Sequence, residues 1–214
     1  MRLEATVAGD GTVYEELKAA ILRGDFSPRQ RLVEVELSED FGASRFQVRR
    51  ALHTLESDGI VEHLPNKGAR IREIGIDEAV EITEVRMVVE GLVAARAAER
   101  VSDEQAEALL DVGRRMRAAV EVGDVGTYSE LNGVLHSSLR DIAQHHKANG
   151  IIARLHGQMV RHQFALSRVP GRPSVSVVQH ENIIAAVVAR DPMAAEAAMR
   201  AHISSVIEAL RAIA

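Results

Sequence analysis

The sequence predicts a mainly α-helical protein in which an N-terminal winged helix-turn-helix, with a small β-hairpin wing, precedes an antiparallel all-α bundle of six helices. Three observations support this fold class. Two short helical patterns lie between residues 34 and 59, two alternating segments then flank a turn, and helical patterns continue from residue 76 to the C-terminus. The segment that leaves the hairpin is the expected boundary between domains of residues 1–74 and 75–214.

The first helix is expected to begin near Thr12, because Thr12 and Glu15 have the spacing of a capping box. Apolar residues then recur at helical spacing, and Gly24 is a typical helix stop. The residues that should face the core are Val13, Leu17, Ala20 and Ile21.

A second capping box, Ser44 with Gln47, predicts that another helix begins at Ser44 and ends near Gly59. Its apolar stripe consists of Val48, Ala51, Leu52 and Leu55. Arg45 and Arg49 lie off that stripe, in a segment from residue 43 to 55 that contains no acidic residue. A helix of this kind, following a shorter helix and a tight turn, is how many proteins present side chains to the major groove of DNA.

The wing is predicted from the alternating segments IVEHL and ARIREI, which flank Pro65, Asn66, Lys67 and Gly68. Turn residues of this kind between two strand-like segments indicate a hairpin. Its tip, with Asn66, Lys67 and Gly68, is expected to lie over the minor groove or the DNA backbone.

Composition narrows the classes of protein. The chain has 214 residues, 46% of them hydrophobic, no cysteine and a formal net charge of −5. A net negative charge argues against a general nucleic-acid coat protein, while a basic helix still permits specific binding. Disulfides and thiolate metal sites are excluded, and there is no leader or run of about 18 apolar residues. We therefore expect a soluble, cytoplasmic protein that does not enter a membrane.

Short turns divide the C-terminal part into six expected helices, which suggests an antiparallel bundle. The first four run approximately over residues 77–100, 102–123, 127–145 and 148–167. A fifth begins after Ser174, and the last begins at Asp191-Pro192 and reaches about Ala212.

Polar side chains interrupt the apolar stripes of this bundle at His136, His180 and His202, each on a different helix. Asn132 precedes His136 by one turn and shares its face. One inward histidine is usually a core residue that finds a hydrogen-bond partner. Three from facing helices suggest a site for zinc, nickel, copper or iron, with positions left open for a ligand oxygen.

The N-terminal sixty residues resemble the GntR family of bacterial transcription regulators. The residues that carry the resemblance are Leu17, Ile21, Gly24, Leu32, Glu36, Leu37, Gly42, Ser44, Arg45, Val48, Arg49, Ala51, Leu52, Leu55, Gly59, Ile60, Val61 and Gly68. The resemblance places Ser44, Arg45, Gln47, Arg49 and Gly68 at DNA-contacting positions. Phe46 and Gln47 depart from the small hydroxyl or proline residues often found there, so an operator sequence cannot be transferred from relatives.

The C-terminal half resembles the FadR-type ligand-binding domain in its six-helix form. That resemblance implies a divalent metal, zinc or nickel, held by Asn132, His136, His180 and His202, with Asn132 replacing the usual aspartate. It also implies a small carboxylate or sugar-acid effector. Arg86 matches an arginine common in the family, and Arg161 is a second candidate for binding the effector, because a guanidinium can take a carboxylate through two hydrogen bonds.

These observations predict a ligand-responsive repressor that binds palindromic operator DNA as a homodimer. A metalloenzyme is one alternative, although His180-Glu181 lacks the second histidine of an HExxH motif because Ile184 takes its place. A helical interaction module with a vestigial winged helix is another, and loss of specific DNA binding would support it.

Overall fold

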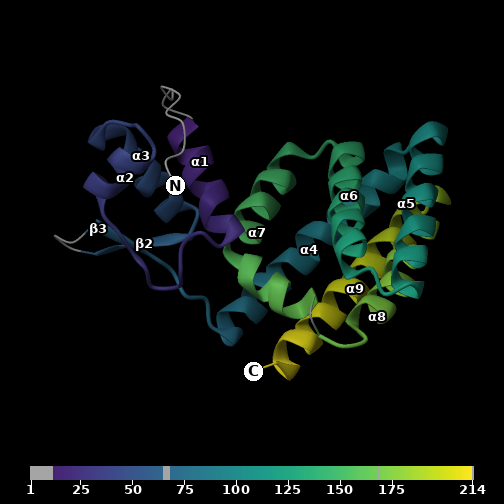
Figure 1. The fold of residues 1–214 in the computed structure, drawn as a ribbon. Helices are drawn as coiled ribbons and strands as arrows, with labels where there is room; N and C mark the ends of the chain where they lie inside the picture. The colour runs from purple at the N-terminus through teal and green to yellow at the C-terminus, as the bar shows by residue number, and fades with distance from the viewer. Residues whose placement is uncertain (1–11, 65–67, 168, 214) are drawn as a thin grey trace. The chain divides into compact units, whose positions relative to one another are not determined.

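The structure is a computed structural model that describes residues 12–64, 68–167 and 169–213. The chain divides into two compact units (Figure 1). The first consists of Met1–Ile74 and His156–Val160, and the second of Gly75–Leu155 and Arg161–Ala214. The predicted fold class is confirmed, because a winged helix-turn-helix is followed by a helical bundle.

The described part of the first unit contains three helices and a three-stranded antiparallel sheet in the order β1-β3-β2. In chain order the elements are α1 (Thr12–Arg23), β1 (Arg31–Leu32), α2 (Glu34–Asp40), α3 (Arg45–Ser57), β2 (Val61–Leu64) and β3 (Gly68–Ile71). The predicted stripe of α3 is buried, as are Val13 and Leu17 of α1. These side chains form one core beneath the sheet.

The capping box at the start of α3 is confirmed. The Ser44 hydroxyl accepts a hydrogen bond from the backbone N–H of Gln47, and the Gln47 side chain accepts one from the backbone N–H of Ser44. Strand β1 was not predicted, because two residues are too short to show an alternating pattern. It pairs with β3 through Arg31 opposite Arg70 and Leu32 opposite Ala69.

Gly68, the first residue of β3, is required by two features of the backbone. Its φ is +84°, and a Cβ atom at this position would lie 2.8 Å from the carbonyl oxygen of Leu32. Because only glycine adopts that φ without cost and brings no Cβ atom, it lets β1 approach the wing closely. The predicted turn residues 65–67, including Asn66 and Lys67, lie outside the described residues.

The second unit is a helical bundle in the described part of the chain. Its helices are α4 (Ile76–Arg100), α5 (Asp103–Glu121), α6 (Val125–Ala143), α8 (Arg172–Val188), α9 (Pro192–Ala212) and α7 (His146–Ser167), except for residues 156–160 of α7, which belong to the first unit. Helices α6 and α7 begin two residues before the predicted start, and α8 also begins before it. The Asp124 side chain caps α6 by accepting from the backbone N–H of Thr127, and α8 accommodates Pro173 in its first turn.

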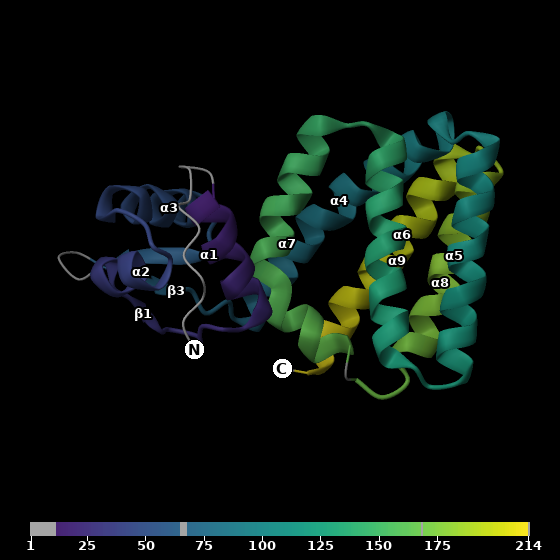
Figure 2. The same ribbon diagram turned by 45° about the horizontal axis from the view of Figure 1, so that its top comes forward.

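Helix α4 lies centrally in this bundle and packs against α6, α8 and α9, while α5 packs against α6 and α8 (Figure 2). The core between these helices is built from alanine, valine, leucine, isoleucine and methionine side chains, with Leu135, Leu139 and Ile183 fully buried. In the described part of the chain, no helix combines the length and apolar character needed to cross a bilayer.

Candidate functional site

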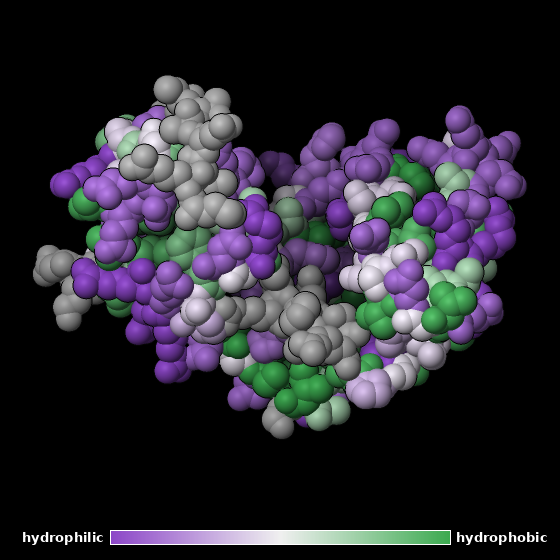
Figure 3. All heavy atoms as spheres, viewed as in Figure 1, coloured by the Kyte–Doolittle hydropathy of each residue, from purple (hydrophilic) through white to green (hydrophobic). Residues whose placement is uncertain are grey.

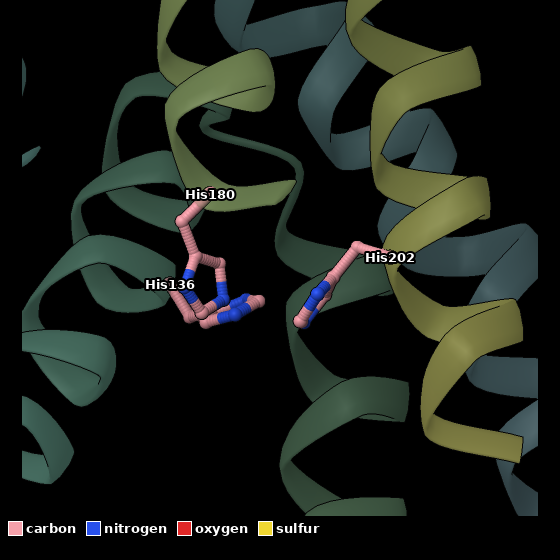
Figure 4. Close-up of side chains that lie close together, drawn as sticks. All are labelled: His136, His180 and His202. Atoms are coloured by element: carbon pink, nitrogen blue, oxygen red, sulfur yellow. The ribbon is translucent and has the colours of Figure 1, made fainter. Parts of the chain in front are cut away.

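The predicted inward histidines come together in the second unit. His136 extends from α6, His180 from α8 and His202 from α9, and their rings face one another (Figure 4). One ring nitrogen from each lies within 4.8 Å of the others. The ring centroids of His180 and His202 are 4.4 Å apart. The ring centroid of His136 lies 5.5 Å from that of His180 and 5.7 Å from that of His202. Helical periodicity therefore identified three side chains that share one site.

Burial keeps the imidazoles of His180 and His202 neutral. His180 and His202 are buried, and 11% of the His136 side chain is exposed. Burial, reinforced by the neighbouring histidines, lowers the pKa of His180 well below its usual value. The same two causes, burial first and then His136, lower the pKa of His202 to about 3. A neutral imidazole keeps the lone pair that a metal ligand must provide.

Each histidine has its Nδ1 atom beside a polar side chain. His136 Nδ1 lies 3.4 Å from Glu90 Oε2, His180 Nδ1 lies 3.2 Å from the Tyr128 hydroxyl, and His202 Nδ1 lies 3.0 Å from Gln179 Oε1. The acceptor oxygens of Glu90 and Gln179 favour a proton on Nδ1. The lone pair then belongs to Nε2 of the same ring, which is the arrangement that outer partners impose on metal-binding histidines.

His180 Nε2 is buried and has no hydrogen-bond partner among the described residues. A buried polar nitrogen without a partner carries a free-energy cost of about 1–3 kcal/mol, which a ligand at this atom would offset. Together with the neutral rings of His180 and His202 and the Nδ1 partners of all three histidines, this orphaned atom makes the donor set fit a divalent transition metal. Asn132, the predicted fourth ligand, is half-buried one turn before His136 on α6.

Arg86 lies close to this cluster through Glu90, which comes one turn later on α4. Both side chains are buried, and the Arg86 Nε atom donates to Glu90 Oε1 at 2.8 Å. Glu90 thus contacts the guanidinium with one oxygen and faces His136 with the other. The side chain of Arg161, the second predicted effector ligand, lies outside what the structure describes.

The described residues of the predicted DNA-contacting set lie in the first unit, at the N-cap and first turns of α3 and, for Gly68, at the first residue of β3. Ser44 and Arg45 are exposed, and hydrophilic residues cover most of the visible surface of α2 and α3 (Figure 3). Gln47 is engaged in the helix cap. Arg49 donates two hydrogen bonds to Glu34 of α2, at 2.9 and 2.7 Å.

The bond between Glu34 and Arg49 corrects the interpretation of the basic helix. The segment from residue 43 to 55 contains no acid, but α2 places a carboxylate directly on one of its arginines. Sequence reasoning also missed Glu90, Tyr128 and Gln179 as histidine partners. The spacing of four residues between Arg86 and Glu90 could have predicted that these two side chains meet on one helix face. No spacing in the sequence predicts the contact of Gln179 with His202.

Comparison with known proteins agrees with this architecture. Residues 10–71 match the model described as bacterial regulatory proteins, gntR family, and residues 81–205 match the FCD domain. The HTH-type transcriptional repressor RspR of Escherichia coli (strain K12) is 27% identical over 212 residues, covering 99% of this chain and 93% of the relative. The HTH-type transcriptional regulator LutR of Bacillus subtilis (strain 168) is 28% identical, covering 89% and 95%.

Among solved structures, E. coli McbR/YncC has the same fold, with a TM-score of 0.77, 21% identity and coverage of 97% of this chain and 99% of that one. These relatives are transcription regulators rather than enzymes, which removes the metalloenzyme alternative. The chain therefore belongs to the gntR family of bacterial regulatory proteins and is a DNA-binding transcription regulator with a C-terminal FCD domain.

Proposed function

We propose that this protein is a repressor in which residues 1–74 bind operator DNA and residues 75–214 bind a divalent metal and a small carboxylate or sugar-acid effector. The observation that carries the proposal is the cluster of three inward histidines, with an orphaned, buried Nε2 atom on His180. Among its relatives, RspR is a repressor by name. Because bacterial DNA lies in the cytoplasm, the protein acts there.

In this proposal His136, His180 and His202 hold the metal, zinc or nickel, through their Nε2 atoms. The side-chain oxygen of Asn132 is the fourth ligand, and it brings no charge. A bound metal supplies a Lewis acid that attracts a carboxylate oxygen. The protein orients the three imidazoles through Glu90, Tyr128 and Gln179, and burial raises the pKa of Tyr128 to about 12, so that its hydroxyl stays protonated.

The effector's carboxylate also needs cationic hydrogen-bond donors, and we assign that role to Arg86 and Arg161. Arg86 keeps N–H groups beyond those that contact Glu90. The effector releases DNA only to the extent that it binds the released state more tightly than the DNA-bound state. In the first unit, Ser44, Arg45, Gln47, Arg49 and Gly68, with Asn66 and Lys67 of the wing, contact the operator.

The repressor acts as a homodimer on a palindromic site, so that two-fold symmetry sets its two recognition helices on two half-sites. An exposed apolar stripe on α4 supports the dimer, since Val85, Val88 and Leu92 are 50%, 51% and 38% exposed. A two-fold axis between Val88 and Val89 would set Val85 opposite Leu92, and Glu81 opposite Arg96 of the other copy. The stripe is therefore complementary to itself in both apolar character and charge.

The metal is tested first, by elemental analysis of protein purified without chelator. We expect close to one equivalent per chain in the wild type and in His146→Ala, whose exposed histidine serves as the control, and no metal in the His136→Ala, His180→Ala double variant. Asn132→Asp should raise metal affinity, because the new carboxylate brings a charge to the site. Equal metal contents in the wild type and the double variant would refute the site.

The contact of Arg45 with DNA bases is tested on an operator sequence that the wild-type protein selects from a pool of random duplexes. Arg45→Ala should weaken binding to this operator by about 1–3 kcal/mol if its side chain contacts a guanine edge. Fluorescence anisotropy measures the change, and the selection repeated with the variant shows whether one base preference is lost. Unchanged affinity and preference would remove Arg45 from the contacting residues.

The dimer is tested by sedimentation of Val88→Glu, which should become monomeric because the charge would be buried at the centre of the proposed interface. Val134→Glu places the same charge at a similarly exposed valine on α6 and should remain dimeric. A dimeric Val88→Glu protein would show that another surface joins the two copies.

A further inference from the structure

The contact between Glu34 and Arg49 is a bidentate salt bridge, in which two nitrogens of one guanidinium donate to the two oxygens of one carboxylate. Arg49 Nε donates to Glu34 Oε1 at 2.9 Å, and Arg49 Nη2 donates to Glu34 Oε2 at 2.7 Å. Two parallel hydrogen bonds fix the plane of the guanidinium as well as its position. The Glu34 side chain is 25% exposed and that of Arg49 is 60% exposed.

Basic side chains beside Glu34 keep its carboxylate ionised, although Glu56 lines the same pocket. Its hydrogen bonds from Arg49 are the largest cause that lowers the pKa of Glu34, and the charges of Arg49, Arg45 and His53 act in the same direction. The pair therefore persists at every pH at which the protein would meet DNA. One of the basic side chains of the recognition helix is neutralised locally before DNA arrives.

The Glu34–Arg49 pair lies beside residues of α3 and of the wing, the two elements that we expect to contact DNA. Glu34 and Arg49 line a pocket of about 70 Å³, whose other walls include His53 of α3, His63 of β2 and Gly68 of β3. The pocket lies between the recognition helix and the wing, the two elements that winged helices use to contact DNA. A carboxylate here repels phosphate groups, because it adds negative charge beside the polyanionic backbone.

We infer that Glu34 is a specificity-determining residue, which holds Arg49 in one orientation and offsets its charge so that this arginine does not bind phosphates of every sequence. The inference rests on the proposed reading of DNA by α3. An unpaired arginine adds affinity for any duplex, since phosphate contacts carry no base information. An arginine fixed by a carboxylate contributes only where the DNA matches its orientation, so the pair raises the ratio of specific to nonspecific affinity.

The test compares Glu34→Gln with Glu36→Gln, an exposed glutamate on the same helix that gives the same change in net charge. Binding to a labelled duplex of arbitrary sequence is measured over a range of KCl concentrations. Glu34→Gln should bind this duplex several-fold more tightly, with a salt dependence steeper by about 0.9 in log K against log[salt], as one additional phosphate contact requires. Glu36→Gln should keep the wild-type slope.

Three further measurements separate pairing from charge and folding. Glu34→Asp retains the charge on a shorter side chain and should give a slope between those of the wild type and Glu34→Gln. The Glu34→Gln, Arg49→Gln double variant should lose the added affinity, because the released arginine is its source. Thermal melting of each variant confirms that the helix-turn-helix is folded.

A wild-type slope in Glu34→Gln, or an equal change in Glu36→Gln, would overturn the inference. The specificity ratio, measured against the selected operator, should fall in Glu34→Gln because nonspecific affinity rises more than specific affinity. If the wild-type protein selects no preferred sequence, the proposed base reading fails, while the slope on the arbitrary duplex still tests the effect of Glu34 on Arg49.

Discussion

Two arginine–glutamate pairs of this chain have the same chemistry and opposite surroundings. Arg86 and Glu90 lie in the bundle with side chains 7% and 3% exposed, whereas Arg49 and Glu34 lie at the surface of the helix-turn-helix. In the bundle, both charges have been removed from water, so each depends on the other. At the surface, water and salt screen the attraction within the pair, so the pair contributes little to stability while both side chains stay accessible from solvent. Burial thus distinguishes a pair that stabilises the fold from one to which we assign a role in DNA recognition.

Removing one member of the buried pair should give the largest effect. Glu90→Leu leaves the Arg86 guanidinium buried without its carboxylate, and we expect the free energy of unfolding to fall by about 3–5 kcal/mol. Denaturant titration in the presence of a chelator measures this loss without a contribution from metal binding. The Arg86→Met, Glu90→Leu double variant should recover most of the stability, since neither charge remains. A double variant as unstable as Glu90→Leu would mean that the uncompensated charge is not the cause.

The buried histidines beside Glu90 should make the metal-free protein sensitive to acid. The pKa of His202 is about 3 in the folded protein, whereas it is about 6.5 in an unfolded chain. Between these values the unfolded chain binds a proton that the folded chain does not, so the free energy of unfolding falls as the pH falls from about 6.5 towards 3. The loss is several kcal/mol, because each pKa unit corresponds to about 1.4 kcal/mol.

Denaturant titrations of chelator-treated protein at a series of pH values measure this dependence. Acidic side chains titrate in part of the same range, so the wild type is compared with His202→Phe, which lacks the titrating imidazole. The variant should show the shallower pH dependence. Parallel curves for the two proteins would place the origin of the acid sensitivity outside His202.

The exposed pair should give the smallest effect on stability. Glu34→Gln should lower the free energy of unfolding by about 0.2–1 kcal/mol, with a difference that shrinks in high salt, because water and ions screen the attraction. Melting curves at low and high KCl, without DNA, test this expectation. A loss as large as that of Glu90→Leu would remove the distinction between the two environments.

Sequence patterns predicted features that depend on local spacing. The capping box at Ser44 fixed the start of α3, and helical periodicity placed His136, His180 and His202 on inward faces, because a helix sets which residues share a side. Domain resemblance supplied the order of the two parts. The capping box and the helical periodicity arise from residues close together in the chain, so a single sequence is enough to reveal them.

Features that depend on contacts between distant elements were not predictable in the same way. The bond from Arg49 to Glu34 joins two helices, and the contact of His202 with Gln179 joins α9 to α8. Neither has a characteristic spacing, because the packing of the elements decides which side chains meet. Strand β1 was missed for a related reason, since its two residues become a strand only by pairing with β3.

Gly68 has a practical consequence for anyone who wishes to redirect this regulator to a new DNA sequence. Any other residue there must adopt an unfavourable φ and displace the carbonyl oxygen of Leu32, which belongs to a different strand. A mutant library that randomises the wing should therefore keep this codon constant. Otherwise, most of its members would be lost to misfolding before any selection for altered binding could act on them.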